Sequence, residues 1–150
     1  MSGRNTLNRW LSIAAIAIGA IMIIAGIATW VNVSKTLEDQ RITVASDASC
    51  MADSVVTGPI TAYCQAEIIN KHALEATGGK TYAELDREDP LRATAMTSSF
   101  LQASLYTSVV AFGVALMAMG IGLVFILLGI AVLRLSSSPK ADPVETPSLA

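Results

Sequence analysis

Two long stretches of the sequence contain no charged residue, and they limit what this chain can fold into more than any other feature. They cover residues 11–32 and 103–133. An α-helix rises about 1.5 Å per residue, so roughly 20 residues cross the hydrocarbon core of a membrane. Lipid offers no hydrogen-bond partner to an open backbone, so each stretch is expected to be a helix. The sequence therefore predicts an all-α membrane protein, in which two transmembrane helices flank a small helical extracytoplasmic domain.

A cleaved signal peptide is the alternative interpretation of the first stretch, because Arg4 and Arg9 precede it. Signal peptides have apolar cores of about 7–15 residues and end at an A-x-A-like site. Here the apolar run is longer and ends in Ala28-Thr29-Trp30. An uncleaved membrane anchor is therefore favoured.

The charges are distributed unevenly along the chain. The segment between the two stretches holds six basic and ten acidic residues, whereas basic residues flank the stretches on the tail side. Those tail residues are Arg4, Arg9, Arg134 and Lys140. Positive residues next to membrane spans stay in the cytoplasm, so both termini are expected inside and the intervening segment outside.

Five segments follow from this pattern, with Trp10 and Trp30 as interfacial anchors of the first span. They are a cytoplasmic lead (residues 1–9), a first transmembrane helix (10–32), a helical extracytoplasmic domain (33–105), a second transmembrane helix (106–134) and a disordered cytoplasmic tail (135–150).

Turn and capping residues predict the helices of the extracytoplasmic domain. Proline at a first helical position starts a helix at Gly58-Pro59, and Gly78-Gly79 ends it. The Thr81-x-x-Glu84 capping box predicts a short helix that ends before Pro90. A last helix is expected to run from Pro90 to about residue 135. The residues expected to pack on the helix of residues 60–77 are Ala93, Met96, Phe100 and Ala103.

Small residues recur at three- and four-residue spacing in both spans, which lets helices approach closely in lipid. In the first span they include Ala15, Gly19 and Gly26. In the second they are Ala111, Ala115, Ala118, Gly122 and Gly129. Two interpretations stay open: the spans pack on each other, or one face binds a helix of another membrane protein.

Cys50 and Cys64 are the only cysteines, and both fall in the predicted extracytoplasmic domain. Because that compartment is oxidising, the pair is expected to form a disulfide. Zinc binding together with His72 lacks the usual C-x2–4-C spacing, and thiol exchange lacks C-x-x-C. Both remain minor alternatives.

Other chemistries find little support. His72 is the only histidine, so an iron site with two histidines is excluded, and no nucleophile motif accompanies it. Gly78-Gly79-Lys80-Thr81 lacks the first glycine of a phosphate-binding loop. The two charge-free stretches also contain no histidine, so they hold none of the ionisable residues that mark ion pathways within a membrane. We therefore expect no catalytic site, no cofactor, no metal and no nucleic-acid partner.

Residues 56–96 and 98–129 resemble a family of short two-span membrane proteins from actinobacteria. The most specific part is Gly-Gly-Lys-Thr-Tyr-Ala-Glu-Leu at residues 78–85. Members often carry an automatic label as the small subunit of an aromatic ring-opening dioxygenase, which a chain with one histidine and two spans contradicts. The resemblance implies a bacterial inner-membrane location and supplies no site residues.

The function expected from these observations is non-enzymatic: an accessory or assembly subunit of a larger envelope or respiratory membrane complex. Its expected partners are the lipid bilayer and other membrane proteins that contact the small-residue helix faces. The alternatives are a thiol-redox factor that uses Cys50 and Cys64, and a membrane sensor with a ligand-binding cap.

Overall fold

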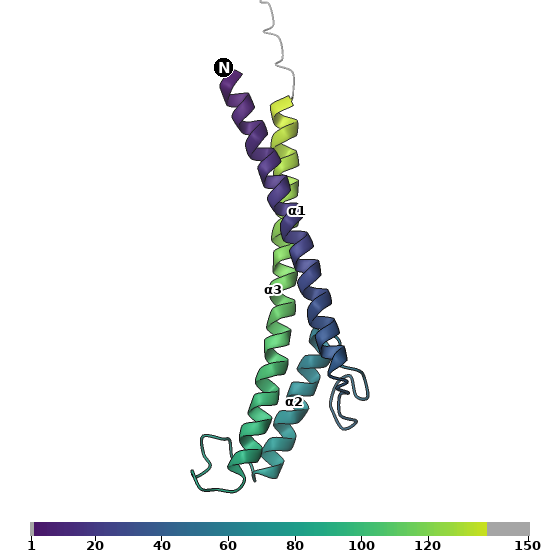
Figure 1. Ribbon diagram of the computed structural model, residues 1–150, viewed down its shortest axis with the longest axis vertical. Coiled ribbons are helices and arrows are strands. Elements are labelled where there is room, and N and C mark those ends of the chain that lie inside the picture. The colour runs from purple at the N-terminus through teal and green to yellow at the C-terminus, as the bar shows by residue number, and fades with distance from the viewer. Residues whose placement is uncertain (1, 138–150) are drawn as a thin grey trace, which may run out of the picture. The chain divides into compact units, whose positions relative to one another are not determined.

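The computed structural model describes residues 2–137, with the side chains of residues 6–136. In this part, the chain forms three α-helices: α1 (Ser2–Asp39), α2 (Pro59–Ala76) and α3 (Arg92–Ser137) (Figure 1). By length and composition, α1 and α3 could each span a membrane. The predicted all-helical fold is therefore present, with a helical segment between two candidate spans. Of the predicted tail, residues 135–137 belong to α3 and residues 138–150 lie outside the described residues.

The described part of the chain divides into two compact units, one made of residues 2–23 and 120–137 and the other of Ile24–Met119. In the first unit, α1 and α3 approach each other through glycines. A Cβ atom at Gly19 would lie 2.5 Å from the carbonyl oxygen of Gly122. One at Gly129 would lie 2.8 Å from the carbonyl oxygen of Ser12. These distances leave no room for a side chain, so the two backbones are in direct contact.

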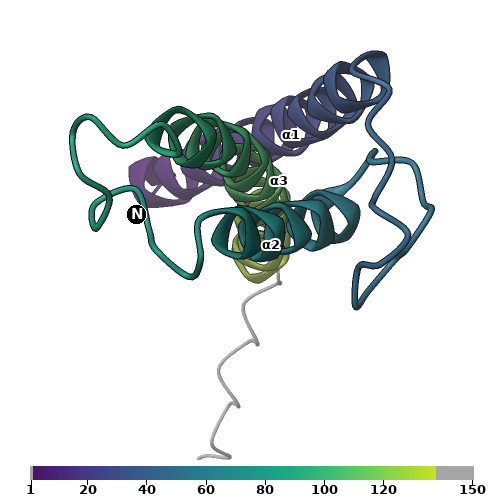
Figure 2. The ribbon, with the colours of Figure 1, turned by 90° about the horizontal axis from the view of Figure 1, so that it is seen from below.

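The second unit contains the main hydrophobic core, to which all three helices contribute. Its buried members are Leu37, Val44, Val56, Ala62, Cys64, Ala66, Leu105 and Phe112. Trp30 of α1 packs edge-on against Phe112 of α3, with ring centroids 4.7 Å apart. α2 lies beside the N-terminal part of α3 in both views (Figures 1 and 2).

The ends of α2 match the prediction from its flanking residues. Pro59 occupies the first turn, and the Thr61 hydroxyl oxygen accepts the Gly58 N–H at 3.2 Å. Gly78 and Gly79 have φ angles of 65° and 85°, in the left-handed region that glycine adopts without steric cost. The glycine pair therefore ends the helix, and the Gly-Gly-Lys-Thr segment is a helix terminus.

An antiparallel pairing that was not predicted follows α1. α1 ends at Asp39, and the β-branched segment after it pairs with residues 54–56 through a bridge between Thr43 and Val55. The backbone N–H of Val44 donates to Ser54 O, and that of Val56 donates to Ile42 O, both at 2.9 Å. We refer to residues 42–56 as the hairpin.

The short helix predicted after Thr81 is wrong, because residues 80–91 form successive turns. The capping interaction itself is present, since the Glu84 carboxylate accepts the Thr81 N–H and hydroxyl, each at 2.8 Å. A helix would then need the Leu85 carbonyl as a backbone acceptor. That oxygen instead accepts from the Arg92 guanidinium at 2.6 Å, while Asp89 N–H donates to Asp86 O. We refer to residues 80–91 as the turn segment.

α3 begins at Arg92 rather than at the predicted Pro90. The Asp89 carboxylate accepts the Leu91 N–H at 2.8 Å, and the Asp89 carbonyl accepts the Arg92 N–H at 3.0 Å. Asp89 therefore caps this end, as short acidic side chains do at helix N-termini.

Candidate interaction surface

A groove on α3 carries the most exposed aromatic side chain of the described part of the chain. Phe100 is 72% exposed and Met96 is 50% exposed, and Tyr82, Ser99 and Ala103 complete the lining. The groove has a volume of about 320 Å³. Burying one large apolar side chain contributes about 1.5–3 kcal/mol, so this surface gains free energy when it is covered. We refer to these five residues as the Phe100 groove.

The turn segment forms one wall of the Phe100 groove, and Arg92 fixes its position. The Arg92 guanidinium lies 4.1 Å from the centre of the Tyr82 ring, a cation–π arrangement. The same guanidinium holds the Leu85 carbonyl, and the Leu85 side chain is buried. One residue at the start of α3 thus anchors both the backbone and the aromatic wall.

The prediction that Ala93, Met96, Phe100 and Ala103 pack on α2 is wrong, because all four are exposed. Leu105 and Tyr106 of α3 instead pack in the core of the second unit. The Tyr106 hydroxyl donates to the Glu67 carboxylate of α2 at 2.5 Å. Ala62 and Ala66 of α2 are fully buried. Their small size permits a close approach of the two helices, which a face with Phe100 would prevent.

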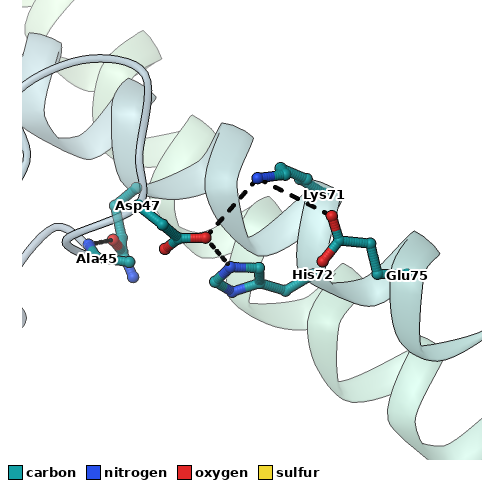
Figure 3. A network of polar contacts seen from close by, with 6 residues as sticks. Ala45, Asp47, Lys71, His72 and Glu75 are labelled. Atoms are coloured by element: carbon teal, nitrogen blue, oxygen red, sulfur yellow. Dashed lines mark hydrogen bonds and ion pairs between the residues drawn. The ribbon is translucent and has the colours of Figure 1, made fainter.

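Three contacts hold the hairpin on one face of α2. Cys50 and Cys64 form a disulfide, as predicted, with the Cys64 side chain buried. The Ala45 N–H donates to the Gln65 side-chain oxygen at 3.0 Å. The His72 ring nitrogen Nε2 lies 2.7 Å from the Asp47 carboxylate, to which it donates (Figure 3). Gln65 and His72 are seven residues apart and share one face of α2, and Cys64 lies at the edge of that face.

Lys71 extends the polar cluster around Asp47. Its Nζ atom lies 3.8 Å from Asp47 and 3.9 Å from Glu75, and these groups are about half exposed (Figure 3). The His72–Asp47 bond attaches the hairpin to α2. In the described residues, no hydroxyl or thiol group forms a hydrogen bond with His72. Nor do His, Cys, Asp and Glu side chains gather there in a group of three that could hold a metal ion.

Acid is expected to weaken the attachment of the hairpin at Asp47. The hydrogen bond from the His72 ring holds the pKa of Asp47 below its ordinary value of 3.8. A carboxyl with a lowered pKa in the folded state stabilises above its unfolded pKa and loses that effect as pH falls through the folded one. We therefore expect the Asp47→Asn variant to be less stable than the wild type at pH 7, and the difference to shrink as the pH falls below 3.8 and through the lowered pKa of Asp47.

Urea unfolding midpoints of both proteins between pH 7 and pH 3 measure this difference. Asp53→Asn is the matched control, because Asp53 is an exposed hairpin residue with no side-chain partner among the described residues. Its midpoint should follow the wild type at every pH. A constant deficit of Asp47→Asn down to pH 3 would contradict the assignment.

Five of the eight predicted small residues lie at contacts between α1 and α3. Gly19, Gly26, Ala115, Gly122 and Gly129 are buried, and Ala15, Ala111 and Ala118 are half-buried. At Gly26 an added Cβ atom would lie 2.8 Å from the Ala115 carbonyl oxygen. The four glycines and Ala115 therefore form contacts within the chain.

Comparison with known proteins identifies no relative. No protein-family model, curated protein or solved structure matches this chain. The resemblance to the actinobacterial two-span proteins therefore stays a prediction.

The sequence did not point to the Phe100 groove, although a signal was present. Residues 93–133 contain no charged residue and no histidine, a run of about 62 Å at 1.5 Å per residue. The hydrocarbon core of a membrane is only about 30 Å thick. Contact with lipid therefore cannot explain the absence of charge along the whole of this run.

Proposed function

We propose that this chain is a non-enzymatic accessory or assembly subunit of a larger membrane complex in a bacterial inner membrane. In this proposal α1 and α3 span the membrane, both termini are cytoplasmic, and α2, the hairpin and the turn segment form an extracytoplasmic cap. The chain is a member of the actinobacterial two-span family. The observation that best supports a role as a subunit of a complex is the Phe100 groove. It is an apolar surface beyond the span, and neither α1 nor α2 covers it.

The position of the Phe100 groove along α3 argues against lipid as its cover. Trp30, at the end of the apolar run of α1, packs on Phe112. In this proposal the pair lies at the outer level of the membrane, where tryptophan is enriched. Phe100 precedes Phe112 by 12 residues, or about 18 Å of helix. At this distance from the hydrocarbon, an exposed aromatic side chain is better covered by protein.

The partner that fits this surface is a transmembrane helix of another subunit that continues beyond the membrane. The exposed face of α3 at Phe100 continues at helical spacing through Val110, Val114 and Met117, which are 63%, 52% and 58% exposed. A helix lying along this face would meet no charged side chain of α3. Basic residues at its outer end would face the turn segment, which is acidic overall. The turn segment holds four acidic residues (Glu84, Asp86, Glu88 and Asp89) and two basic ones (Lys80 and Arg87).

The test is capture of a partner through the Phe100 groove. A photo-crosslinking residue, p-benzoylphenylalanine, replaces Met96 in the groove or Leu101 as the control, and the tagged chain is purified at native abundance in mild detergent. Leu101 is also 50% exposed but is not a lining residue of the groove. We expect a stoichiometric partner that crosslinks from Met96, through a peptide of one of its own membrane helices, and not from Leu101.

A substitution pair tests the energetic contribution of the groove. Phe100→Gln is expected to reduce co-purification of that partner at least tenfold, since burial of a large aromatic contributes about 1.5–3 kcal/mol. Leu101→Gln should leave it within twofold. A chain that migrates alone on native gels, or equal losses in both variants, would contradict the proposal.

A further inference from the structure

A second concavity lies where α1 and α3 leave the apolar zone. Asn32, Val33 and Thr36 of α1 line one side, and Thr107, Ser108 and Ala111 of α3 line the other. Its volume is about 260 Å³, and all of its lining residues belong to the second unit. We refer to it as the interfacial cleft. It combines apolar side chains with hydroxyl groups and, unlike the Phe100 groove, a side-chain amide.

The polar groups of the interfacial cleft differ in their hydrogen bonding. The Thr36 hydroxyl donates to Asn32 O at 2.9 Å and that of Thr107 to Ala103 O at 2.7 Å. Their oxygens keep free lone pairs. The Asn32 side-chain amide has no hydrogen-bond partner among the residues described, so its two N–H groups are available to an acceptor.

A cation flanks the interfacial cleft on α1. Lys35 follows Asn32 by three residues, and residues at this spacing are neighbours on a helix surface. No Asp or Glu of the described part of the chain forms an ion pair with Lys35. A lysine side chain is long enough to place its ammonium group at the mouth of the cleft. Cation and amide donors together are complementary to a phosphate group.

We propose that the interfacial cleft binds the headgroup of an anionic phospholipid, with the phosphate between Lys35 and the Asn32 amide. One acyl chain lies below it along the small side chains of Ala25 and Thr29, which share the α1 face of Asn32. The inference rests on the proposed membrane insertion of α1 and α3. It is independent of the Phe100 groove and of any protein partner.

Native mass spectrometry tests lipid binding to the interfacial cleft. The full chain is purified in mild detergent and titrated with phosphatidylglycerol or phosphatidylcholine. We expect one phosphatidylglycerol to be retained in preference to phosphatidylcholine. Lys35→Gln should weaken phosphatidylglycerol binding about tenfold, the scale of one lost charge-assisted hydrogen bond. Asn32→Leu, which removes the amide without changing the charge, should weaken it as well.

Arg41→Gln is the matched control, because Arg41 is an exposed cation outside the interfacial cleft and forms no ion pair among the described residues. It should bind phosphatidylglycerol as the wild type does. Equal retention by all variants, or no preference over phosphatidylcholine, overturns the inference. Extraction of the cell membranes with alkaline carbonate separates the two proposals. A chain that stays in the membrane but shows no lipid preference disproves the cleft alone, and a chain that is extracted disproves both.

Discussion

Replacing Gly122 by leucine is expected to destabilise the protein by about 3 kcal/mol, the upper part of the range for overpacking a close contact. A Cβ atom at this position would lie 2.6 Å from the Gly19 carbonyl oxygen and 2.9 Å from an Ile23 side-chain carbon. The carbonyl belongs to the α1 backbone, so it cannot rotate away as a side chain can. For a chain of this size the melting temperature should fall by roughly 6–12 °C.

Gly120→Leu is the matched control for this substitution. Gly120 lies two residues earlier in α3, and a Cβ atom there would meet nothing within 4 Å. Helix propensity changes equally in both variants, so only the contact with α1 differs. Thermal unfolding followed by circular dichroism in mild detergent should give a Gly120→Leu midpoint close to that of the wild type. Equal losses in the two variants would show that the close α1–α3 contact does not stabilise the protein.

The double substitution Cys50→Ser and Cys64→Ser should have an effect of similar size. The two cysteines are 14 residues apart, and closing a loop of this length stabilises a protein by about 3 kcal/mol, mainly by restricting the unfolded chain. Urea unfolding should show this loss, and dithiothreitol should lower the wild-type midpoint to that of the variant. Dithiothreitol should leave the variant itself unchanged.

The same two cysteines separate the proposed function from a thiol-redox function. If the disulfide is structural, the double variant still captures its partner at a temperature at which it is folded. Loss of function in the folded variant would favour redox chemistry. In intact cells, a membrane-impermeant thiol reagent should label these residues only after reduction. Labelling before reduction contradicts the disulfide, and none after reduction and mild unfolding contradicts the proposed orientation.

Local signals in the sequence were sufficient for α2 and for the two long helices. Pro59 and the Gly78-Gly79 pair act within a few residues of the helix ends that they determine, so no tertiary information was needed. Charge-free length alone identified α1 and α3 as candidate spans. The disulfide followed from there being only two cysteines in one segment.

Features that depend on distant residues were missed. The hairpin turns back through Met51 and Asp53 at positive φ, and methionine carries no preference for that region. The capping residues of the turn segment favour a helix. The Leu85 carbonyl oxygen instead accepts a hydrogen bond from Arg92, which lies seven residues further along the chain. The packing face of α3 was misassigned because the regular spacing of Met96, Phe100 and Ala103 suggested one buried face, whereas the buried alanines of α2 favour a close approach without Phe100.

The contacts between the hairpin and α2 differ in chemistry, and this difference has a consequence for how the hairpin responds to its surroundings. A reductant opens the bond between Cys50 and Cys64 but leaves Asp47 charged. Acid neutralises Asp47 once the pH falls through the lowered pKa of this carboxyl, but it leaves the disulfide closed. The bond from Ala45 to Gln65 involves only amide groups and responds to neither. The attachment is therefore redundant. A reductant or acid alone removes one of the three bonds, and the other two still hold the hairpin on α2.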